Sequence, residues 1–239
     1  PAIHATVMVL DGATGQTLAL LDGSYLTALR TGAASGLATR LLARPDARTL
    51  AVIGAGGMAT AQIEAVCAVR DITDIRLYSP RRAAALAESL RGKFPIRAVA
   101  SAAEALAGAD IIVTSTDATS QVVLAGQVAA GVHINAIGAY TPQMVEIAPD
   151  IVAQARLFVD QREAAWAEAG DLIQARDAGL ISDVHGELGE LAAGRVAGRT
   201  SESEMTLFKS VGVGAQDLYA ARAALASAER LGLGVEIAF

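Results

Sequence analysis

The stretch from Thr49 to Ala59 constrains the fold more than any other part of the chain. It begins with a short apolar run, Thr49–Ile53, that is typical of a buried strand. Glycines follow at positions 54, 56 and 57, and a helix-favouring run then extends from Met58 to about Arg70. This order of strand, glycine turn and helix is the context in which the pattern G-x-G-x-x-G/A indicates a dinucleotide-binding site.

Each position of this fingerprint has a physical role. Gly54 permits a tight turn, Gly56 lets the backbone approach a pyrophosphate, and the small Ala59 lets the helix pack on the strand. The N-terminus of the helix presents free N–H groups and a partial positive charge to the phosphates. We therefore expect Gly54 and Gly56 to lie against a bound dinucleotide.

The rest of the chain predicts an α/β protein. Predicted strands lie at 49–53, 75–78, 96–99, 110–114, 133–137 and 157–160, with helices between them, as at 81–91 and 102–106. Strands that alternate with helices predict a doubly wound parallel sheet of the Rossmann type. Before this region, runs at 5–10 and 17–21 flank two turn signals and predict a β-hairpin, followed by a helix at 24–42. From about Gln161 the chain is expected to be mostly helical, ending in an amphipathic run at 211–230.

Composition excludes several classes of partner. A formal net charge of −6 and the lack of a basic tract argue against nucleic acid and anionic membranes. No apolar run reaches the roughly 18–20 residues of a membrane span, and no signal peptide is evident. The single Cys67 rules out an internal disulfide, so we expect a cytoplasmic protein. The three histidines, His4, His133 and His185, are too far apart for a spaced metal motif, and we assign no metal.

The end of the strand at 75–78 bears on the choice of coenzyme. In NAD enzymes an acidic residue at this position binds the ribose 2′-hydroxyl. Here the strand is followed by Ser79, Arg81 and Arg82, with no acid to repel a 2′-phosphate. Arginine suits phosphate recognition, so the sequence favours NADP(H) over NAD(H). The alternative is that both arginines are solvated residues in the first turn of a helix.

Two more polar segments follow predicted strands. They are Thr114–Asp117, which includes Thr116, and Asn135–Tyr140. Ligands bind at the carboxyl ends of parallel strands, so both segments are candidates for the nicotinamide half of the coenzyme. The alternative is the ordinary polarity of loops that connect strands to helices.

Several ordered motifs resemble one known family over essentially the whole chain. These motifs are Asp11–Gly15, Leu26–Ser35, Gly54–Ala59, Ile134–Gly138, Val159–Gln161, Glu187–Glu190 and Leu207–Gly212. Together they look like the ornithine cyclodeaminase/μ-crystallin family of NAD(P)-dependent enzymes. The resemblance implies a Rossmann-type domain with a second α+β domain for substrate and dimer contacts, built from the chain ends. On this basis residues 1–42 belong to the second domain, 43–160 form the NAD(P)-binding domain, and 161–239 return to the second domain as helices.

The resemblance also implies roles for individual residues. Arg30 matches the arginine that holds the substrate carboxylate, which suits a planar bidentate donor. Gly57 and Met58 match positions whose backbone meets the pyrophosphate, and Ser79 matches the ribose position. The remaining matches are Thr114 and the residues Ile137, Gly138, Ala139 and Tyr140 on the nicotinamide side, and Ser210 and Val211 at the junction of coenzyme and substrate.

Reactions in this family include reduction of cyclic ketimine carboxylates, cyclodeamination of ornithine to proline, and alanine dehydrogenation. We expect an NADPH-preferring homodimeric reductase of a small imino acid, such as pyrroline-2-carboxylate. Ornithine cyclodeaminase carries a catalytic aspartate where this chain has Tyr140, and a tyrosine with a pKa near 10 cannot replace that base near neutrality. The resemblance implies a catalytic lysine on a segment that precedes the hairpin and lies outside the 239 residues. A crystallin-like protein that binds NADP without turnover is a further alternative.

Overall fold

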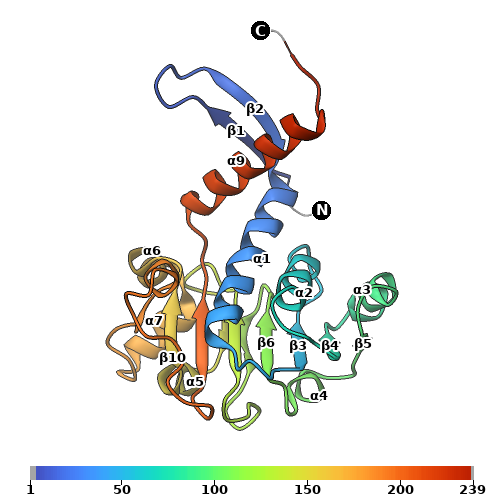
Figure 1. Cartoon of the computed structure of the whole chain (residues 1–239). Coiled ribbons are helices and arrows are strands. Elements are labelled where there is room, and N and C mark those ends of the chain that lie inside the picture. The colour runs from blue at the N-terminus through green and yellow to red at the C-terminus, as the bar shows by residue number, and fades with distance from the viewer. Residues whose placement is uncertain (1–3, 238–239) are drawn as a thin grey trace. The chain divides into compact units, whose positions relative to one another are not determined.

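The computed structural model describes residues 4–237, which fall into two compact units (Figure 1). One unit, here called the sheet unit, runs from Thr31 to Gly212. The other, here called the end unit, joins the residues up to Arg30 with those from Val213 onward. Helix α1 (Gly23–Leu42) begins in the end unit and finishes in the sheet unit.

The sheet unit is built on eight parallel strands in the order β11-β10-β12-β8-β6-β3-β4-β5. These strands are β3 (Thr49–Ile53), β4 (Asp74–Tyr78), β5 (Ile96–Ala98), β6 (Ile111–Thr114), β8 (His133–Ala136), β10 (Arg156–Val159), β11 (Gly186–Glu187) and β12 (Thr206–Lys209). The strand order reverses between β3 and β6, which is the switch point of a doubly wound sheet. The predicted fold class is confirmed.

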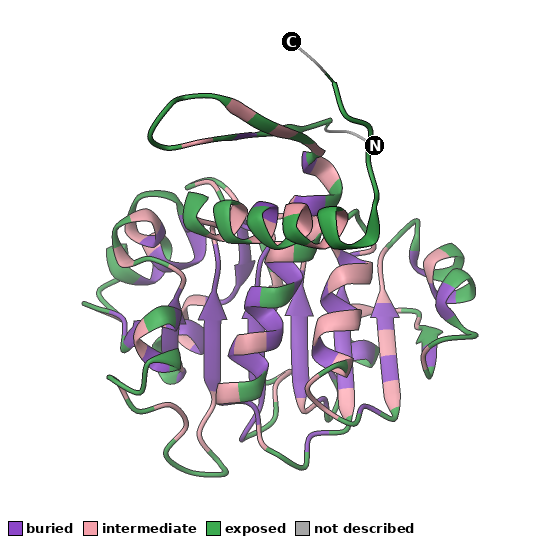
Figure 2. Ribbon diagram, turned by 45° about the horizontal axis from the view of Figure 1, so that its top comes forward, coloured by how far each residue is buried: buried purple, intermediate pink, exposed green. Residues whose placement is uncertain are grey.

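Helices cover both faces of this sheet, which explains why its strands read as continuous apolar runs. On β3, Leu50 and Val52 pack on one face beside residues of α2 (Ala59–Cys67) and α3 (Ala83–Leu90). Ala51 and Ile53 pack on the other, in a core that includes residues of four further helices. These are α4 (Ala102–Leu106), α5 (Pro149–Gln154), α6 (Arg162–Glu168) and α7 (Gly170–Asp177). A third core joins α1 to α8 (Leu188–Ala192), β10 and β12. Figure 2 shows the central strands almost wholly buried.

Two features of the sheet unit were not predicted. The short strands β7 (Thr119–Val123) and β9 (Val145–Ile147) form a separate parallel pair. Strands β11 and β12 lie in a region expected to be mostly helical, and both belong to the large sheet. Strand β12 has only four residues and one of them is a lysine, so its hydrophobic pattern is too short to identify. The domain boundaries at 42/43 and 160/161 remain a prediction, while the compact sheet unit extends to Gly212.

The end unit contains the predicted hairpin. Strands β1 (Thr6–Leu10) and β2 (Thr17–Asp22) are antiparallel. The Asp11 carboxylate shapes the turn by accepting hydrogen bonds from the backbone N–H groups of Ala13 and Thr14. One face of the hairpin packs with residues of α1 and α9 (Gly214–Leu231) around Val9, Leu26 and Ala221. The other face carries four apolar side chains that are each more than half exposed, namely Met8, Leu10, Leu18 and Leu20.

No helix within residues 4–237 is long and apolar enough to cross a membrane.

Candidate coenzyme site

Most predicted site residues lie at one edge of the large sheet. The fingerprint follows β3, Ser79 follows β4, Thr114 ends β6, Ile137 follows β8, and Ser210 follows β12. The register aligns these strand ends, since Ile53 lies opposite both Tyr78 and Thr114, and Ala136 lies opposite both Thr114 and Lys209. The structure therefore brings these segments together at the carboxyl edge, where open α/β sheets bind ligands.

Position 54 has a backbone conformation and surroundings that only glycine can adopt. Its φ angle is +110°, a conformation that side chains with a Cβ rarely adopt. A Cβ at this position would lie 2.5 Å from the carbonyl oxygen of Ser115, in the segment after β6. The Gly54 N–H donates to the carbonyl of Tyr78 at 2.9 Å, which fixes the start of the loop against β4. The loop is thus pinned on both sides at the switch point.

Beyond Gly54 the loop leaves its backbone donors free. Among the described residues, no acceptor pairs with the N–H groups of Gly56, Gly57 or Met58. Gly56 and Gly57 are exposed, and a Cβ at either would meet nothing within 4 Å. Helix α2 begins directly after them, at Ala59. Unpaired N–H groups at the N-terminus of a nine-residue helix suit an anion, so these residues fit a pyrophosphate.

The loop after β4 carries two free cationic side chains. Arg81 and Arg82 are exposed, and neither forms an ion pair with any residue in the described range. Ser79 is half-buried beside them. Because β4 is the neighbour of β3, this loop lies next to the fingerprint, where the adenosine ribose binds in this fold. The arrangement allows, but does not require, a phosphate on that ribose.

The segments after β6 and β8 are tied together by a residue that the sequence prediction missed. Glu146, in β9, is fully buried, and its carboxylate accepts hydrogen bonds from Thr114, Thr116, Gly138 and Ala139. Its signal in the sequence is a single acidic residue within the apolar run Val145–Ala148. A charge in such a run is a candidate for a buried polar network.

A second missed residue organises the segment after β12. Asp160 Oδ2 accepts hydrogen bonds from Ser210 Oγ at 2.9 Å and from the N–H groups of Val211 at 3.0 Å and Gly212 at 2.6 Å. Asp160 directly follows β10, the strand beside β12. The predicted junction residues Ser210 and Val211 are therefore held in place by a carboxylate from the neighbouring strand.

The structure does not place Arg30 among these residues, because Arg30 belongs to the end unit. There its guanidinium donates from Nε to Asp217 Oδ1 at 3.1 Å and from Nη1 to Gln216 Oε1 at 3.0 Å. These partners on α9 are 187 and 186 residues away along the chain, so no local pattern could reveal them. A guanidinium has five N–H donors, so this pairing leaves donors for a carboxylate ligand.

Tyr140 follows β8 and its residue is 48% exposed. The residue after it begins the turn that leads to β9. A tyrosine that is open to water at this position can contact a ligand.

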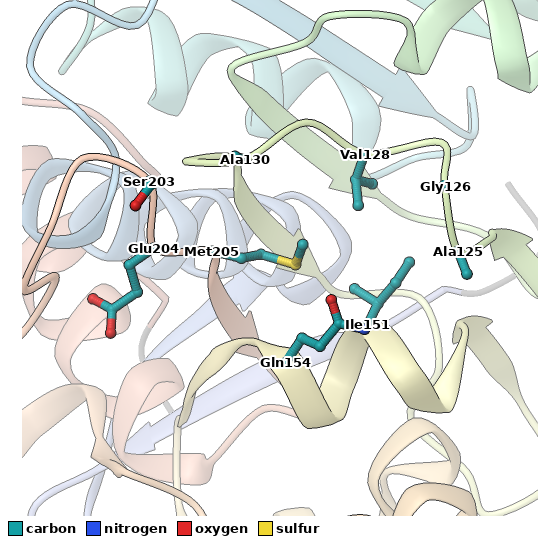
Figure 3. Close-up of a pocket in the computed structure, with 9 residues that line it drawn as sticks. All are labelled: Ala125, Gly126, Val128, Ala130, Ile151, Gln154, Ser203, Glu204 and Met205. Atoms are coloured by element: carbon teal, nitrogen blue, oxygen red, sulfur yellow. The ribbon is translucent and has the colours of Figure 1, made fainter.

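A pocket of about 460 Å³ lies at the opposite edge of the sheet (Figure 3). Its lining comes from the connection between β7 and β8, from α5, and from the segment before β12. The N–H of Gly131 donates to the carbonyl of Ser203 at 2.9 Å beside it, where β8 and β12 begin. This is the amino edge, so the pocket is separate from the coenzyme site.

Cys67 and His133 are placed as structural residues. Cys67 ends α2, is half-buried, and has its pKa raised to about 11 by burial. His133 is fully buried at the start of β8, where it bonds Thr206 and Asn135. Within residues 4–237 no three His, Cys, Asp or Glu side chains are arranged to hold a metal ion.

A parallel doubly wound sheet with a glycine fingerprint at its switch point defines a dinucleotide-binding protein of the Rossmann type. The family model "Ornithine cyclodeaminase/mu-crystallin family" matches residues 1–230. This chain belongs to that family.

Individual relatives agree with this assignment. The chain is 45% identical to a Delta(1)-pyrroline-2-carboxylate reductase of Bacillus cereus over 244 aligned residues, covering 99% of this chain and 75% of that protein. It is similar to the structure of Thermococcus litoralis Delta(1)-pyrroline-2-carboxylate reductase in complex with NADH and L-proline, with a TM-score of 0.96, 39% identity, and coverage of 99% and 75%. It is also similar to an archaeal alanine dehydrogenase dimer with bound NAD, with a TM-score of 0.92, 35% identity, and coverage of 100% and 75%.

Proposed function

We propose that this protein is an NAD(P)H-dependent reductase of a small cyclic imino acid, with pyrroline-2-carboxylate as the first candidate. The observation that carries the proposal is the geometry of a dinucleotide site at the carboxyl edge of a chain 45% identical to a reductase of that name. The solved relative with NADH and L-proline supports the same chemistry, because proline is the product of reducing the imine bond of pyrroline-2-carboxylate.

The coenzyme, when bound, supplies a hydride to the imine carbon. The residues of this chain bind and orient it. The free N–H groups of Gly56, Gly57 and Met58 hold the pyrophosphate. Ser79 holds the ribose together with the two arginines of the same loop, Arg81 and Arg82. The segments at Thr114–Thr116 and Ile137–Ala139 line the nicotinamide side. These roles are proposals that rest on the position of each segment at the carboxyl edge.

Arg30 is proposed to hold the substrate carboxylate. Its pairing with Asp217 orients the guanidinium and lowers the entropy lost when a ligand binds. Arg30→Lys keeps the charge but cannot make a bidentate pair with a carboxylate. We expect this variant to raise KM for the imino acid at least tenfold while the Kd of the coenzyme changes less than twofold. An equal loss of coenzyme affinity would contradict the role.

The reductase activity is tested by following NADPH and NADH oxidation with pyrroline-2-carboxylate and, separately, with pyruvate plus ammonia. Turnover of the imino acid alone supports the proposal, and turnover of pyruvate with ammonia identifies an alanine dehydrogenase instead. Release of ammonia from ornithine would identify a cyclodeaminase, which Tyr140 disfavours as argued above. Coenzyme binding without turnover, also in a longer chain that carries the N-terminal segment of the relatives, would indicate a binding protein.

We propose that the coenzyme is NADP(H) in preference to NAD(H), because Arg81 and Arg82 form no ion pair within the described residues and no acid follows β4. Calorimetric titration should give an NADPH Kd at least tenfold below that of NADH. A variant with Ser79→Asp and Arg81→Ala should reverse this order. The exposed Arg91, which pairs with Glu88, provides the control, and Arg91→Ala should leave the ratio unchanged. Equal affinities in the unsubstituted protein would make the two arginines ordinary surface charges.

We also propose a homodimer that uses the exposed face of the hairpin. Four apolar side chains, each about half exposed, lie together on one sheet face, which is the kind of patch that marks an interaction surface, and an archaeal relative is a dimer. Leu20→Glu should shift the mass measured by light scattering from dimer to monomer. Leu180→Glu, at an equally exposed leucine in the sheet unit, should not. A monomeric unsubstituted chain would refute this part of the proposal. The cytoplasmic location predicted from the single cysteine stays a prediction.

A further inference from the structure

Three charged side chains are completely buried beneath the segments proposed for the nicotinamide. Glu146 lies in β9, Asp171 in α7 and Lys209 in β12, and each is 0% exposed. Burial of a single charge costs several kcal/mol unless it is paired and hydrogen-bonded. Three such groups in one place therefore need a structural or functional explanation.

The Glu146 carboxylate joins two loops through five hydrogen bonds. Oε1 accepts from the Thr116 N–H at 2.7 Å and from Thr116 Oγ1 at 2.8 Å. Oε2 accepts from Thr114 Oγ1 at 2.8 Å and from the N–H groups of Gly138 at 2.7 Å and Ala139 at 3.2 Å. All five partners are donors, which is the environment of an ionised carboxylate. One side chain thus clamps the end of β6 to the end of β8.

Asp171 holds the backbone of β9 at Glu146, and Lys209 pairs with Asp171. Asp171 Oδ1 accepts from the N–H groups of Glu146 at 2.7 Å and Ile147 at 2.9 Å. Its other oxygen lies 2.9 Å from Lys209 Nζ. Burial raises the pKa of Glu146, Lys209 opposes this rise, and Asp171 adds to it. The lysine is the cation that offsets two buried carboxylates.

The loops after β6 and β8 are in close contact at Gly138. A Cβ on Gly138 would overlap the carbonyl oxygen of Thr116 and Glu146 Oε1. The close approach of the two segments therefore depends on a glycine at 138 and on the carboxylate that bridges them.

This arrangement also sets the polarity of the two hydroxyl groups. Thr114 and Thr116 each donate their only hydroxyl proton to Glu146. Toward any other partner these oxygens can act only as acceptors. The carboxamide of a nicotinamide carries an NH₂ group, and the half-buried Thr116 hydroxyl can accept a hydrogen bond from it. Thr114 is 0% exposed, so its hydroxyl serves to anchor the end of β6 to Glu146.

We infer that Glu146 is a positioning residue for the nicotinamide, fixing the loops after β6 and β8 and orienting the half-buried Thr116 hydroxyl as an acceptor. The inference rests on the proposed function, because it takes a nicotinamide coenzyme to be the ligand of this edge. It adds a residue that touches neither the pyrophosphate loop nor the ribose loop. Its effect is therefore confined to one half of the coenzyme.

The test compares ligands that differ only in the nicotinamide. ADP-ribose and NADH, or 2′-phospho-ADP-ribose and NADPH if the phosphate is preferred, are titrated by calorimetry into the unsubstituted protein and into Glu146→Gln. The amide of glutamine turns one acceptor into a donor that faces N–H and O–H donors. We expect Glu146→Gln to raise the Kd of the reduced coenzyme at least tenfold and the Kd of the matching ADP-ribose fragment less than twofold. The fluorescence emission of the bound reduced nicotinamide should also move toward that of the free coenzyme.

Asp110→Asn is the matched control. The Asp110 carboxylate also bridges segments by accepting backbone N–H groups, from Arg48 at 2.9 Å and Thr49 at 3.0 Å, but at the amino edge of the sheet. This variant should keep the affinity ratio of the two ligands. If Glu146→Gln lowers the affinity for both ligands equally, or for neither, the positioning role is refuted.

A folding defect in Glu146→Gln is covered by Gly138→Ala, which keeps the carboxylate but forces the two loops apart. A loss of affinity in Gly138→Ala that is confined to the reduced coenzyme supports the inference. Failure of both variants to fold would assign Glu146 a purely structural role and overturn it. The proposed function is judged separately, on the unsubstituted protein. If that protein binds neither fragment nor coenzyme, the coenzyme site itself is wrong, whatever Glu146 does.

Discussion

The two edges of the large sheet differ in the side chains that contribute most to bridging their loops. At the carboxyl edge the bridging groups are carboxylates, Glu146 and Asp160, which accept from backbone N–H groups of the loops. At the amino edge the main bridging groups are guanidinium groups, Arg70 and Arg199, which donate to backbone carbonyls. The carboxylate Asp110 also accepts two backbone N–H groups at the amino edge, but the carbonyls there are bound by the two arginines.

The amino edge shows why arginine serves there. Helix α1 ends at Leu42, and the last carbonyls of a helix have no partner within it. Arg70 donates to the carbonyls of Thr39 at 3.0 Å and Arg40 at 3.1 Å, and Arg199 donates to that of Leu42 at 2.7 Å. Two side chains from distant segments thus cap one helix. At the other edge the glycine fingerprint contrasts with this closure, because its backbone donors find no acceptor among the described residues and stay free for an anionic ligand.

The largest effect is expected at the carboxyl edge, from Lys209→Met. The change leaves Asp171 and Glu146 buried without a cation, and breaking a buried pair costs about 3–5 kcal/mol. Urea unfolding should show this loss in the free energy of unfolding. The chain contains one other lysine, Lys93, whose side chain is 63% exposed. Lys93→Met should change stability by less than about 0.5 kcal/mol, and a similar loss in both variants would contradict the comparison.

The amino edge should respond to Arg70→Met by about 2–3 kcal/mol, since hydrogen bonds from a charged donor to several carbonyls are lost. The guanidinium donates to the carbonyls of Thr39, Arg40, Ala43, Arg44 and Val69. The affinity for ADP-ribose should stay within twofold of the unsubstituted protein, because Arg70 is at the other end of the sheet. A lower affinity without a loss of stability would show that the two edges do not act separately.

Acid should act on the two edges in opposite directions. His133, at the amino edge, has its pKa lowered from 6.5 to about 3 by burial and by the positive charges of Arg199 and Arg70. Between these values the unfolded chain binds the proton more readily, so stability falls as pH falls. From pH 7 to pH 5 this histidine should remove about 2 kcal/mol. The raised pKa of Glu146 works the other way, because the folded state then binds a proton more readily.

The contribution of His133 is measured by comparing how the free energy of unfolding changes with pH in His133→Gln and in the unsubstituted protein. The stability lost between pH 7 and pH 5 should be about 2 kcal/mol smaller than in the unsubstituted protein, even if the variant is less stable at every pH. His4, which is exposed, gives the control variant His4→Gln. An unchanged slope in His133→Gln would mean that the buried imidazole does not couple folding to protons.

The fold followed from the sequence because its strongest signals are local. The fingerprint after β3, the alternation of strands and helices, and the hairpin turn at Asp11–Gly15 each depend on neighbouring residues. The placement of the pyrophosphate loop at the switch point needed only the strand order of this fold class.

The bridging carboxylates could not be predicted in the same way. Glu146 bonds residues up to 32 positions away, and Asp160 bonds residues 50–52 positions away. Which loops they join depends on β9 and β12, two strands of three and four residues whose pairing is set by tertiary packing. The partners of Arg30 on α9 were hidden for the same reason.

The raised pKa of Cys67 makes its thiol poorly reactive toward alkylating reagents at neutral pH. With a thiol pKa of about 11, only about one molecule in ten thousand carries the reactive thiolate at pH 7. Maleimide reagents should therefore pass over the native cysteine and react with one introduced at an exposed position. Cysteines placed at Thr14 in the end unit and at Arg91 in the sheet unit would accept spin labels without removal of Cys67. Distances between such labels would then report directly how ligands act on both units.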